Sequence, residues 1–394
     1  MRATLFPALL GLVALAGTAS AQSVPCGGDF GRFVAGLKQE AGANGHSAQA
    51  ADRFFANVRR DPKVIAADNS QGVFRKTFTD FSSALISGNR MANGVANGKK
   101  YAGLLKEAER RYGVPPGVIL AFWGFETDYG AVQGNFNTAN ALVTLAHDCR
   151  RPDLFRPQVF AALSLYEKGA FDPATTTGAW AGEIGMIQML PKDILERGVD
   201  GDGDGRVTLK TSIPDAIMSG GRMLADHGWR RGEPWLQEVT VPDQMDWSLS
   251  GLDTPRPAAD WLRMGVKPRG GGKVAANLNA ALLLPQGRKG PAFLAYPNYY
   301  VFFDWNKSFV YVTTAAYFAT RLSGAPAFDP GNPDPPLTDA QMTLLQQKLT
   351  AHGHDVGAID GVLGAMTRSA VQKEQARLGL PADAWPTRTL LDRL

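Results

Sequence analysis

The segment Val114–Gly130 constrains the fold of this chain more than any other stretch of its sequence. Pro115 and Pro116 suit the first turn of a helix, where a missing N–H costs little. Residues Val118–Phe125 would be apolar on every face of that helix, and such a helix is expected inside a domain core. We therefore predict a buried central helix with the rest of a large domain packed around it.

A single carboxylate, Glu126, ends this apolar run, just before Tyr129 and Gly130 close the helix. Burying a charge is costly, so such a carboxylate either pairs with a cation or keeps its proton to higher pH. No Lys or Arg lies near it in the sequence. A carboxylic acid with a raised pKa is what general acid catalysis requires at neutral pH. The segment thus predicts a catalytic acid, the alternative being a helix-end Glu that points into water.

Composition sets wide limits on the class of protein. The chain has 394 residues, of which 44% are hydrophobic and 20% charged, as in a globular protein. The length accommodates one large domain or about two to three smaller ones. The net charge of +4 includes no run of Lys or Arg, so no nucleic-acid partner is indicated. Nothing demands an oligomer, and we expect a monomer.

The first residues indicate export. Arg2 precedes the apolar run Leu5–Ala16, and Ala19–Ala21 has the small-x-small pattern of a cleavage site. This pattern predicts a secretory signal peptide over residues 1–21, cleaved after Ala21. A membrane anchor would need about 20 apolar residues, and no stretch of the sequence is that long and apolar. We therefore expect a soluble periplasmic protein with no transmembrane segment.

Two cysteines follow, Cys26 and Cys149. In an oxidising compartment they can form a disulfide that ties the N-terminal arm to the body, although sequence alone does not establish the geometry. The alternative of a catalytic cysteine lacks the Cys–His arrangement that it would need.

Helical patterns dominate the remaining sequence. Ser47 is a suitable N-cap for a helix over Ala48–Arg59, and Tyr101–Tyr112 repeats the helical period. An aromatic stripe at helical spacing, best explained as core packing, comprises Phe74, Phe78, Phe81 and Leu85. Further helices are predicted over Asn140–His147 and Val159–Lys168.

A Pro-rich stretch over residues 325–337 interrupts the helical pattern and is typical of a semi-rigid linker. Beyond it, the capping box Thr338–Gln341 opens a helix that should run to Ala351. A second helix is predicted over Thr367–Leu378. The chain is thus divided into a large domain over 22–324, the linker, and a small helical module over 338–394.

The clearest spacing signal lies in the loop 200–215, which starts as an EF-hand calcium loop does. Three carboxylates at positions 1, 3 and 5 converge on one ion, and Gly205 at position 6 permits the sharp turn. The usual Glu at position 12 is replaced by Thr211. We expect a structural Ca²⁺, with an Asp-Gly surface turn as the alternative. The candidate ligands are Asp200, Asp202, Asp204 and the carbonyl of Arg206.

Four motifs resemble the lytic transglycosylase B family, soluble members included. Phe122–Gly130 resembles its catalytic-helix motif, and Gly178–Pro191 is similar to its Gly-Gln loop. The loop that starts at Asp200 resembles its calcium site, in which a late Asp, here Asp215, completes the ligand shell. Tyr296–Tyr300 with Asn306 is similar to the closing segment of its cleft. The resemblance covers about residues 30–324 and implies a lysozyme-like α+β core within a large, mainly α domain.

The resemblance implies a mechanism with one catalytic residue and no cofactor. Glu126 would protonate the β-1,4 glycosidic oxygen between N-acetylmuramic acid and N-acetylglucosamine of peptidoglycan. The acetamido group of the substrate would stabilise the oxocarbenium-like centre. The Glu126 carboxylate would then take the proton of the C6 hydroxyl, which closes a 1,6-anhydro ring. Asp128, the only other nearby carboxylate, faces away at i+2 on a helix.

The resemblance also assigns substrate contacts to Gln188, Tyr300, Asn306 and Tyr129, and it exposes two departures. Trp305 occupies a position where the family pattern has Tyr, and Glu183 replaces a small residue. Glu183 could support Glu126 from behind, or it could be a second catalytic carboxylate that permits hydrolysis. We favour the supporting role.

The C-terminal module resembles the helical peptidoglycan-binding domain of many wall hydrolases. This resemblance predicts a three-helix module whose binding residues are Asp360, Gly361, Gly364, Thr367 and Arg368. An exported enzyme tethered to its insoluble polymer by such a module is coherent. Two alternative functions remain at this point: a muramidase that hydrolyses the same bond, and a non-catalytic scaffold that only grips peptidoglycan.

Overall fold

Helix α7, Pro116–Thr127, is the central helix of the structure, a computed structural model that describes residues 23–69 and 75–394. Pro115 is its N-cap, and every residue from Gly117 to Gly124 is buried. Helix α14, Phe309–Leu322, packs along it, and the rings of Phe125 and Phe318 stack with centroids 4.9 Å apart. The predicted buried helix is therefore confirmed.

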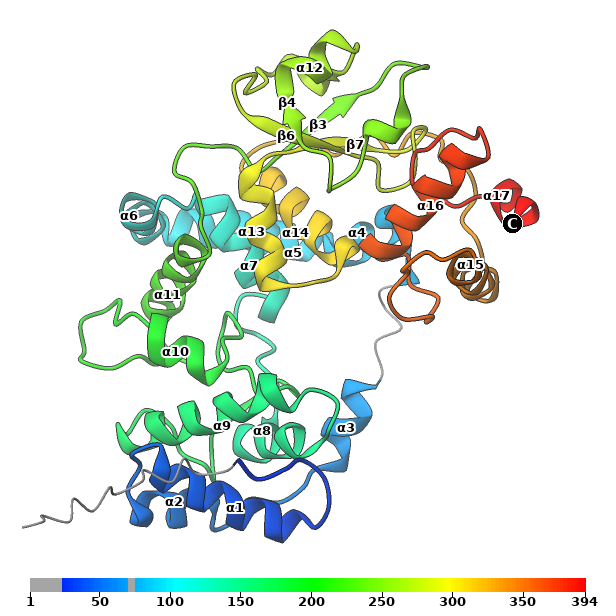
Figure 1. The fold of residues 1–394 in the computed structure, drawn as a ribbon. Coiled ribbons are helices and arrows are strands. Elements are labelled where there is room, and N and C mark those ends of the chain that lie inside the picture. Colours follow the sequence, from blue (N-terminus) through cyan, green and yellow to red (C-terminus); the bar gives the residue numbers. More distant parts are fainter. Residues whose placement is uncertain (1–22, 70–74) are drawn as a thin grey trace, which may run out of the picture.

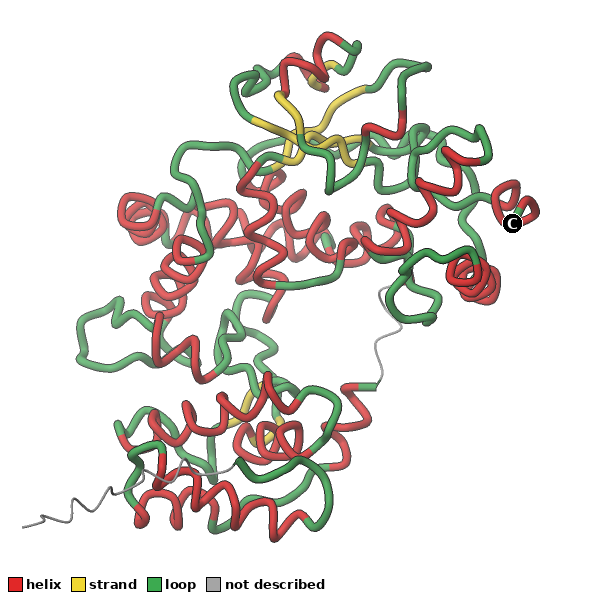
Figure 2. Tube along the Cα trace, viewed as in Figure 1, coloured by secondary structure: helices red, strands yellow, loops and turns green. Residues whose placement is uncertain are grey.

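Helices surround α7 on several sides (Figures 1 and 2). Helices α5 (Gly88–Lys100), α6 (Ala102–Tyr112) and α11 (Ile213–Asp226) pack against α7, while α4 (Phe78–Leu85) and α13 (Pro297–Trp305) pack against α14. A second group, linked through α10 (Pro191–Arg197), comprises α1 (Phe30–Ala43), α2 (Ala48–Phe55), α3 (Pro62–Asp68), α8 (Thr138–His147) and α9 (Pro152–Glu167). One continuous hydrophobic core runs through both groups.

A five-stranded antiparallel sheet lies at one end of the helical body, in the strand order β4-β6-β7-β3-β5. Trp261 is fully buried in the separate small core of this region and donates its indole N–H to Ala280. The strands are β3 (Leu236–Thr240), β4 (Arg256–Pro257), β5 (Lys267–Pro268), β6 (Asn279–Leu283) and β7 (Ala292–Ala295). Short helices accompany them: η2 (Trp247–Leu249), α12 (Ala258–Arg263) and η3 (Arg269–Gly271). A two-stranded sheet pairs β1 (Phe136–Asn137) with β2 (Thr177–Gly178).

The C-terminal module consists of α15 (Asp339–Ala351), α16 (Ala365–Arg377) and α17 (Arg388–Arg393) around its own core. The predicted capping box at Thr338 and Gln341 is present. The module lies against the larger domain beside α4 and the sheet (Figure 1). The predicted fold class, a mainly α protein with a small three-helix module, is confirmed.

Several predicted helix limits differ from the structure. The helix predicted to reach Arg59 ends at Phe55, because the next residues leave it to contact α8, where the Arg59 N–H bonds Asn140. Helix α9 begins at Pro152, earlier than predicted, and tolerates Pro157 in its second turn. In the aromatic stripe Phe78 and Phe81 are buried as predicted, whereas Phe74 lies outside the described residues.

Candidate active site

Glu126 lies partly buried in the last turn of α7 and receives two hydrogen bonds on one oxygen. The Tyr311 hydroxyl donates to Oε1 over 2.6 Å, and the Trp305 indole Nε1 donates to the same atom over 2.9 Å. Its other oxygen, Oε2, accepts no hydrogen bond from the residues that the structure describes. A proton on this carboxyl group therefore belongs on Oε2, since Oε1 already accepts from two donors.

The two residues that donate to Glu126, Trp305 and Tyr311, lie on either side of the turn between α13 and α14. Trp305 ends α13, and its ring lies 4.2 Å from that of Phe122 on α7, which fixes its orientation. Asn306 begins the turn, where its side-chain oxygen accepts the Ser308 N–H at 2.8 Å. Tyr311 then follows in the first turn of α14. Sequence reasoning did not identify Tyr311, because α14 contains three other aromatic residues and nothing in the sequence distinguishes it from them.

Unusual backbone geometry is concentrated around Glu126. Four non-glycine residues in the described chain have positive φ, and three of them are Asp128 (50°), Tyr129 (60°) and Gln188 (51°). Such left-handed residues persist only where the surrounding structure holds them, and they cluster at functional sites. Here the turn allows the Tyr129 ring to fold back on α7, where any side chain at Gly124 would collide with it.

The segment 178–191 is fixed opposite the end of α7. The buried Thr127 hydroxyl donates to the Met186 carbonyl over 2.6 Å and also accepts the Gly130 N–H. Gly185 must lack a side chain, because a Cβ would come within 2.5 Å of Leu209. Glu183 in this segment is partly buried, and its Oε2 atom has no hydrogen-bond partner among the described residues.

Burial raises the pKa of Glu126 to about 7, and the charge of Glu183 adds to this rise. The hydrogen bonds from Tyr311 and Trp305 act in the opposite direction, since they stabilise the carboxylate. Burial also raises the pKa of Glu183, opposed by the attraction of Arg151. The pKa of Tyr311 is raised well above its usual value by burial and by Glu126, so this hydroxyl remains a donor. The site therefore holds an acid that exchanges its proton near neutral pH.

Residues 29–320 match the family described as the transglycosylase SLT domain, and residues 338–394 match a peptidoglycan binding domain. This chain belongs to the lytic transglycosylase B family. The membrane-bound lytic murein transglycosylase B of Escherichia coli K12 is 29% identical over 230 residues, which are 58% of this chain and 62% of that protein. The match thus spans less than two thirds of the relative.

Two solved structures extend this likeness to the fold. SltB3 from Pseudomonas aeruginosa, in complex with NAG-anhNAM-pentapeptide, superposes with a TM-score of 0.85 at 37% identity, over 93% of this chain and 99% of that one. SltB1 from the same organism has a TM-score of 0.66 at 27% identity, over 74% of this chain and 98% of that one.

The residues that the family resemblance assigned to substrate are not all brought to Glu126. Gln188 lies in the Gly-Gln loop, and its amide donates to the carbonyl of Gly185 at 2.7 Å. The Tyr129 hydroxyl donates to the Arg90 carbonyl over 3.1 Å. The Tyr300 hydroxyl donates to the Leu252 carbonyl over 2.8 Å and so braces the 248–254 segment. Asn306 caps the turn that carries Trp305 and Tyr311.

The loop 200–215 folds as a compact acidic turn. Asp200, Asp202 and Asp204 each offer an oxygen, and these atoms lie within 4.8 Å of one another. Calcium binds oxygen at about 2.3–2.6 Å, so two ligands of one ion lie at most about 5 Å apart, and this set fits. The Arg206 carbonyl accepts no hydrogen bond within the described chain. Asp215 differs: its two oxygens accept the N–H groups of Gly201 and Thr208, which fastens both ends of the loop.

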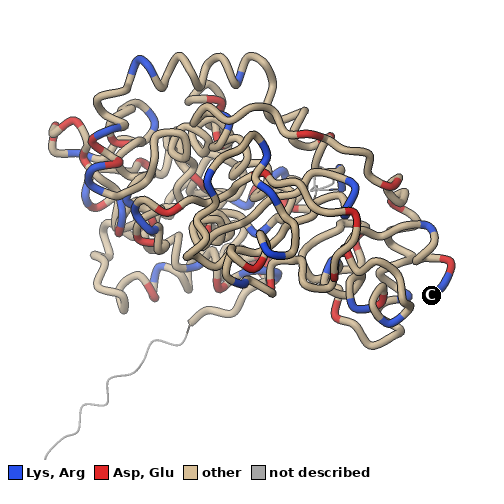
Figure 3. The backbone as a smooth tube through the Cα atoms, turned by 90° about the horizontal axis from the view of Figure 1, so that it is seen from above, with Lys and Arg blue, Asp and Glu red and all other residues tan. Residues whose placement is uncertain are grey.

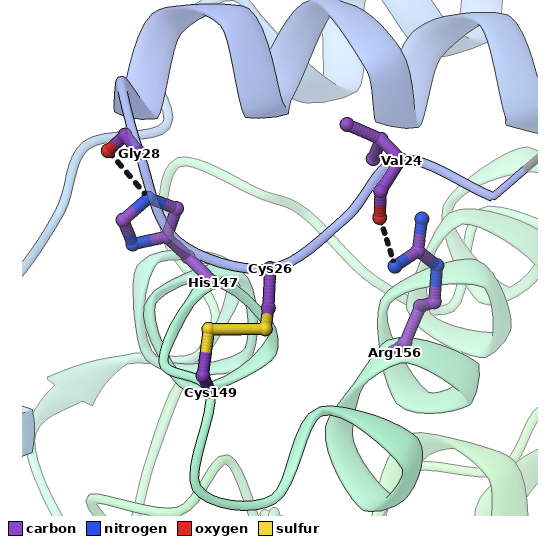
Figure 4. Close-up of a disulfide and its surroundings, with 6 residues drawn as sticks. All are labelled: Val24, Cys26, Gly28, His147, Cys149 and Arg156. Atoms are coloured by element: carbon purple, nitrogen blue, oxygen red, sulfur yellow. Dashed lines mark hydrogen bonds between the residues drawn. A yellow bond between two sulfur atoms is a disulfide. The ribbon is translucent and has the colours of Figure 1, made fainter.

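Cys26 and Cys149 form a disulfide that joins the N-terminal arm to the turn after α8 (Figure 4). Two hydrogen bonds support it: His147 Nε2 contacts the Gly28 carbonyl at 3.1 Å, and Arg156 donates to the Val24 carbonyl at 2.6 Å. The predicted signal peptide lies outside the described residues. None of the helices within 23–69 and 75–394 combines the length and apolar character needed to cross a bilayer.

The residues that were predicted to bind the wall are largely turned inward. Thr367 is buried and donates to the Val356 carbonyl, and the Gly361 N–H bonds Gln346. Arg368 reaches the larger domain, where it donates to the Pro285 carbonyl over 2.6 Å. Asp360 is exposed and caps its own turn through the Val362 N–H. Gly364 is the N-cap of α16.

Charged residues of both signs are interspersed over the whole molecule (Figure 3). The linker is also part of the body: the Asn332 N–H donates to the Lys289 carbonyl, and Lys289 pairs with Asp334 at 2.7 Å. In this arrangement the segment 325–337 lies along the catalytic domain instead of extending away from it.

Proposed function

We propose that this protein is an exported lytic transglycosylase that cleaves the β-1,4 bond between N-acetylmuramic acid and N-acetylglucosamine and leaves 1,6-anhydro-N-acetylmuramic ends. The observation that carries the proposal is the arrangement at Glu126: an acid with a pKa near 7, two donors on Oε1, and an unbonded Oε2. Family membership and the sugar complex of the relative SltB3 support the substrate class.

In this proposal the two carboxyl oxygens of Glu126 have separate roles. The Oε2 proton is given to the glycosidic oxygen as the bond to the leaving sugar breaks. The carboxylate that remains is stabilised at Oε1 by Tyr311 and Trp305, which do not have to move. The same carboxylate then accepts the proton of the C6 hydroxyl as the anhydro ring closes. The acid is regenerated, no water is consumed, and the substrate's acetamido group assists at the anomeric carbon.

The hydrolytic alternative depends on Glu183 as a second catalytic carboxylate. True hydrolysis usually needs a second carboxylate that activates water or attacks the sugar, and Glu183 is the nearby candidate. Its Oε2 atom is buried and accepts no hydrogen bond from the described residues, and the charge of Glu183 acts on Glu126. We therefore assign Glu183 to the support of Glu126, whose pKa it raises.

Three further assignments complete the proposal. The signal peptide over 1–21 directs the chain to the periplasm, an oxidising compartment in which the Cys26–Cys149 disulfide persists. Ca²⁺ held by Asp200, Asp202 and Asp204 would brace the loop without taking part in the reaction. The module over 338–394 adds contacts to peptidoglycan, and the protein acts as a monomer.

The test is digestion of purified sacculi, followed by mass spectrometry of the released muropeptides. The wild type should release anhydro-muramic ends, and Glu126→Gln should reduce them by about 100-fold or more. Glu109→Gln, a carboxylate on α6 away from the site, is the matched control. Reducing muramic ends would establish a muramidase and implicate Glu183. An absence of soluble products from both proteins would favour the scaffold.

A further inference from the structure

A pocket of about 400 Å³ lies where the C-terminal module meets the catalytic domain. One wall is the segment 248–254 and the other is helix α16. The floor includes Leu284, just after β6, and Phe309, at the start of α14. A volume of this size is within the range of sites that bind small ligands, about 300–1,000 Å³. The pocket therefore exists only because the two domains are docked.

Hydrogen bonds across the interface hold the two walls in place. The Gln372 side-chain amide donates to the carbonyls of Trp247 and Ser250, at 3.2 and 2.8 Å. Arg368 donates to the Pro285 carbonyl, and its guanidinium carbon lies 4.5 Å from the centre of the Phe309 ring. Because these contacts join side chains of α16 to main-chain atoms of the larger domain, the shape of the pocket is largely preformed.

The lining combines an apolar floor with two opposite charges that have no partner. Leu252, Leu284 and Phe309 supply apolar surface. Asp253 on one wall and Lys373 on the other are exposed, and neither makes a hydrogen bond or an ion pair with any residue in 23–69 and 75–394. A ligand that satisfies all three features carries a carboxylate, an ammonium group and small apolar side chains. A short zwitterionic peptide has this chemistry.

We propose that this pocket binds the peptide stem of the peptidoglycan substrate, a proposal that rests on the function given above. The stem carries free carboxylates, the amine of a diamino acid and the methyl groups of alanines. Lys373 pairs with a carboxylate and Asp253 with the amine, while the methyl groups contact Leu252 and Phe309. The module thus contributes to peptide recognition next to the catalytic domain instead of acting only as a separate anchor.

The position of the pocket suits this ligand. Phe309 begins the helix whose Tyr311 donates to Glu126, so the pocket and the acid lie at the same end of α14. The Tyr300 hydroxyl also connects the pocket wall at Leu252 to α13, which ends at Trp305. An extended stem of five residues spans about 17 Å, and Phe309 in the pocket floor is two residues from Tyr311 in α14.

The experiment is calorimetric titration of the full-length protein with a free stem pentapeptide that contains meso-diaminopimelate. Lys373→Gln and Asp253→Asn should each weaken binding by about two- to fivefold, as expected for solvent-exposed ion pairs. Lys106→Gln and Asp243→Asn, exposed charges elsewhere, should leave it unchanged. Amidating the peptide's carboxyl group should weaken binding to the wild type but not further weaken binding to Lys373→Gln.

The outcomes separate this proposal from the function on which it rests. The enzyme does not cleave the free peptide, so the titration measures binding without catalysis. The rate of cleavage of peptide-free glycan strands should be the same for the wild type and both pocket variants. Absence of peptide binding at about 5 mM, or unchanged binding by both variants, overturns the pocket assignment even if sacculi are digested normally. Failure to release anhydro ends overturns the function and leaves the titration interpretable.

Discussion

The indole Nε1 of Trp305 lies 2.9 Å from Oε1 of Glu126 and donates a hydrogen bond to it. Trp305 thus supplies a donor at the acid together with Tyr311. With both donors on one oxygen, the carboxyl group presents the other oxygen to its substrate.

The pH dependence of kcat/KM for cleavage should reflect the pKa of Glu126. Glu126 acts as an acid, so kcat/KM should fall as pH rises through its pKa of about 7, and this fall is the alkaline limb of the pH profile. Tyr311→Phe removes a donor that favours the carboxylate, so the alkaline limb should move to higher pH. Glu183→Gln removes a negative charge, so the limb should move to lower pH. Tyr166→Phe, on α9, should leave the limb in place. An alkaline limb that Glu183→Gln does not shift would mean that Glu183 is uncharged in this range.

The same acid should reduce the stability of the folded protein at neutral pH. Its pKa is about 7 in the folded state against an ordinary 4.5. The folded protein is therefore destabilised by ionisation of this group: its contribution to the free energy of unfolding is fully present below pH 4.5 and is lost as pH rises through 7. Glu126→Gln keeps an oxygen for Tyr311 and Trp305 but does not ionise. We expect a free energy of unfolding equal to that of the wild type at pH 4 and higher by about 1–3 kcal/mol at pH 8. Urea denaturation at both pH values measures this, and an equal difference at both would contradict the raised pKa.

Calcium should stabilise the loop formed by Asp200, Asp202 and Asp204. Ca²⁺ binds only the folded arrangement, so the melting temperature should rise with its concentration, by the equivalent of about 2.7 kcal/mol at 100 times Kd. The rise should be lost in Asp202→Ala and retained in Asp243→Ala, an exposed carboxylate near the sheet. No rise in the wild type would exclude the calcium assignment.

Local chemistry explains how much of this structure could be predicted. The apolar run of α7, the capping box at Thr338 and the three aspartates from Asp200 each depend on neighbours within one turn or loop, and all were evident in the sequence. Tyr311 could not be found in this way, because 185 residues separate it from Glu126.

The docking of the module was also beyond sequence reasoning. A motif shows which residue types are present, but packing decides which way they face. Arg368 was assigned to the wall because it belongs to a motif, whereas in the structure it contacts Pro285 and Phe309 of the catalytic domain. The stretch 325–337 was predicted to be a semi-rigid linker, and its contacts with the larger domain, from Asn332 and Asp334 to Lys289, were not evident in the sequence.

The disulfide between Cys26 and Cys149 should contribute strongly to stability. It links residues 123 apart in sequence, and closing a loop of that length restricts the unfolded chain by about 4–5 kcal/mol in the entropic description. The double replacement of Cys26 and Cys149 by Ser should therefore lower the free energy of unfolding by about 2–5 kcal/mol. Chemical denaturation should show the loss, and reduction of the wild type should reproduce it. Equal stability of the oxidised and reduced wild type would contradict this account.

Docking of the module depends on Gln372, whose amide satisfies the carbonyls of Trp247, Ser250 and Ala382. Gln372→Leu leaves these groups without their donor, which costs about 1–3 kcal/mol where they are buried. The module should then separate from the catalytic domain more often, while its own core around Leu345 and Leu349 persists. Hydrogen exchange should therefore increase at residues 247–254 and 325–337 but not within α15. Gln347→Leu, an exposed glutamine on α15, is the matched control. If exchange rises equally within α15, Gln372 stabilises the module itself and not its docking.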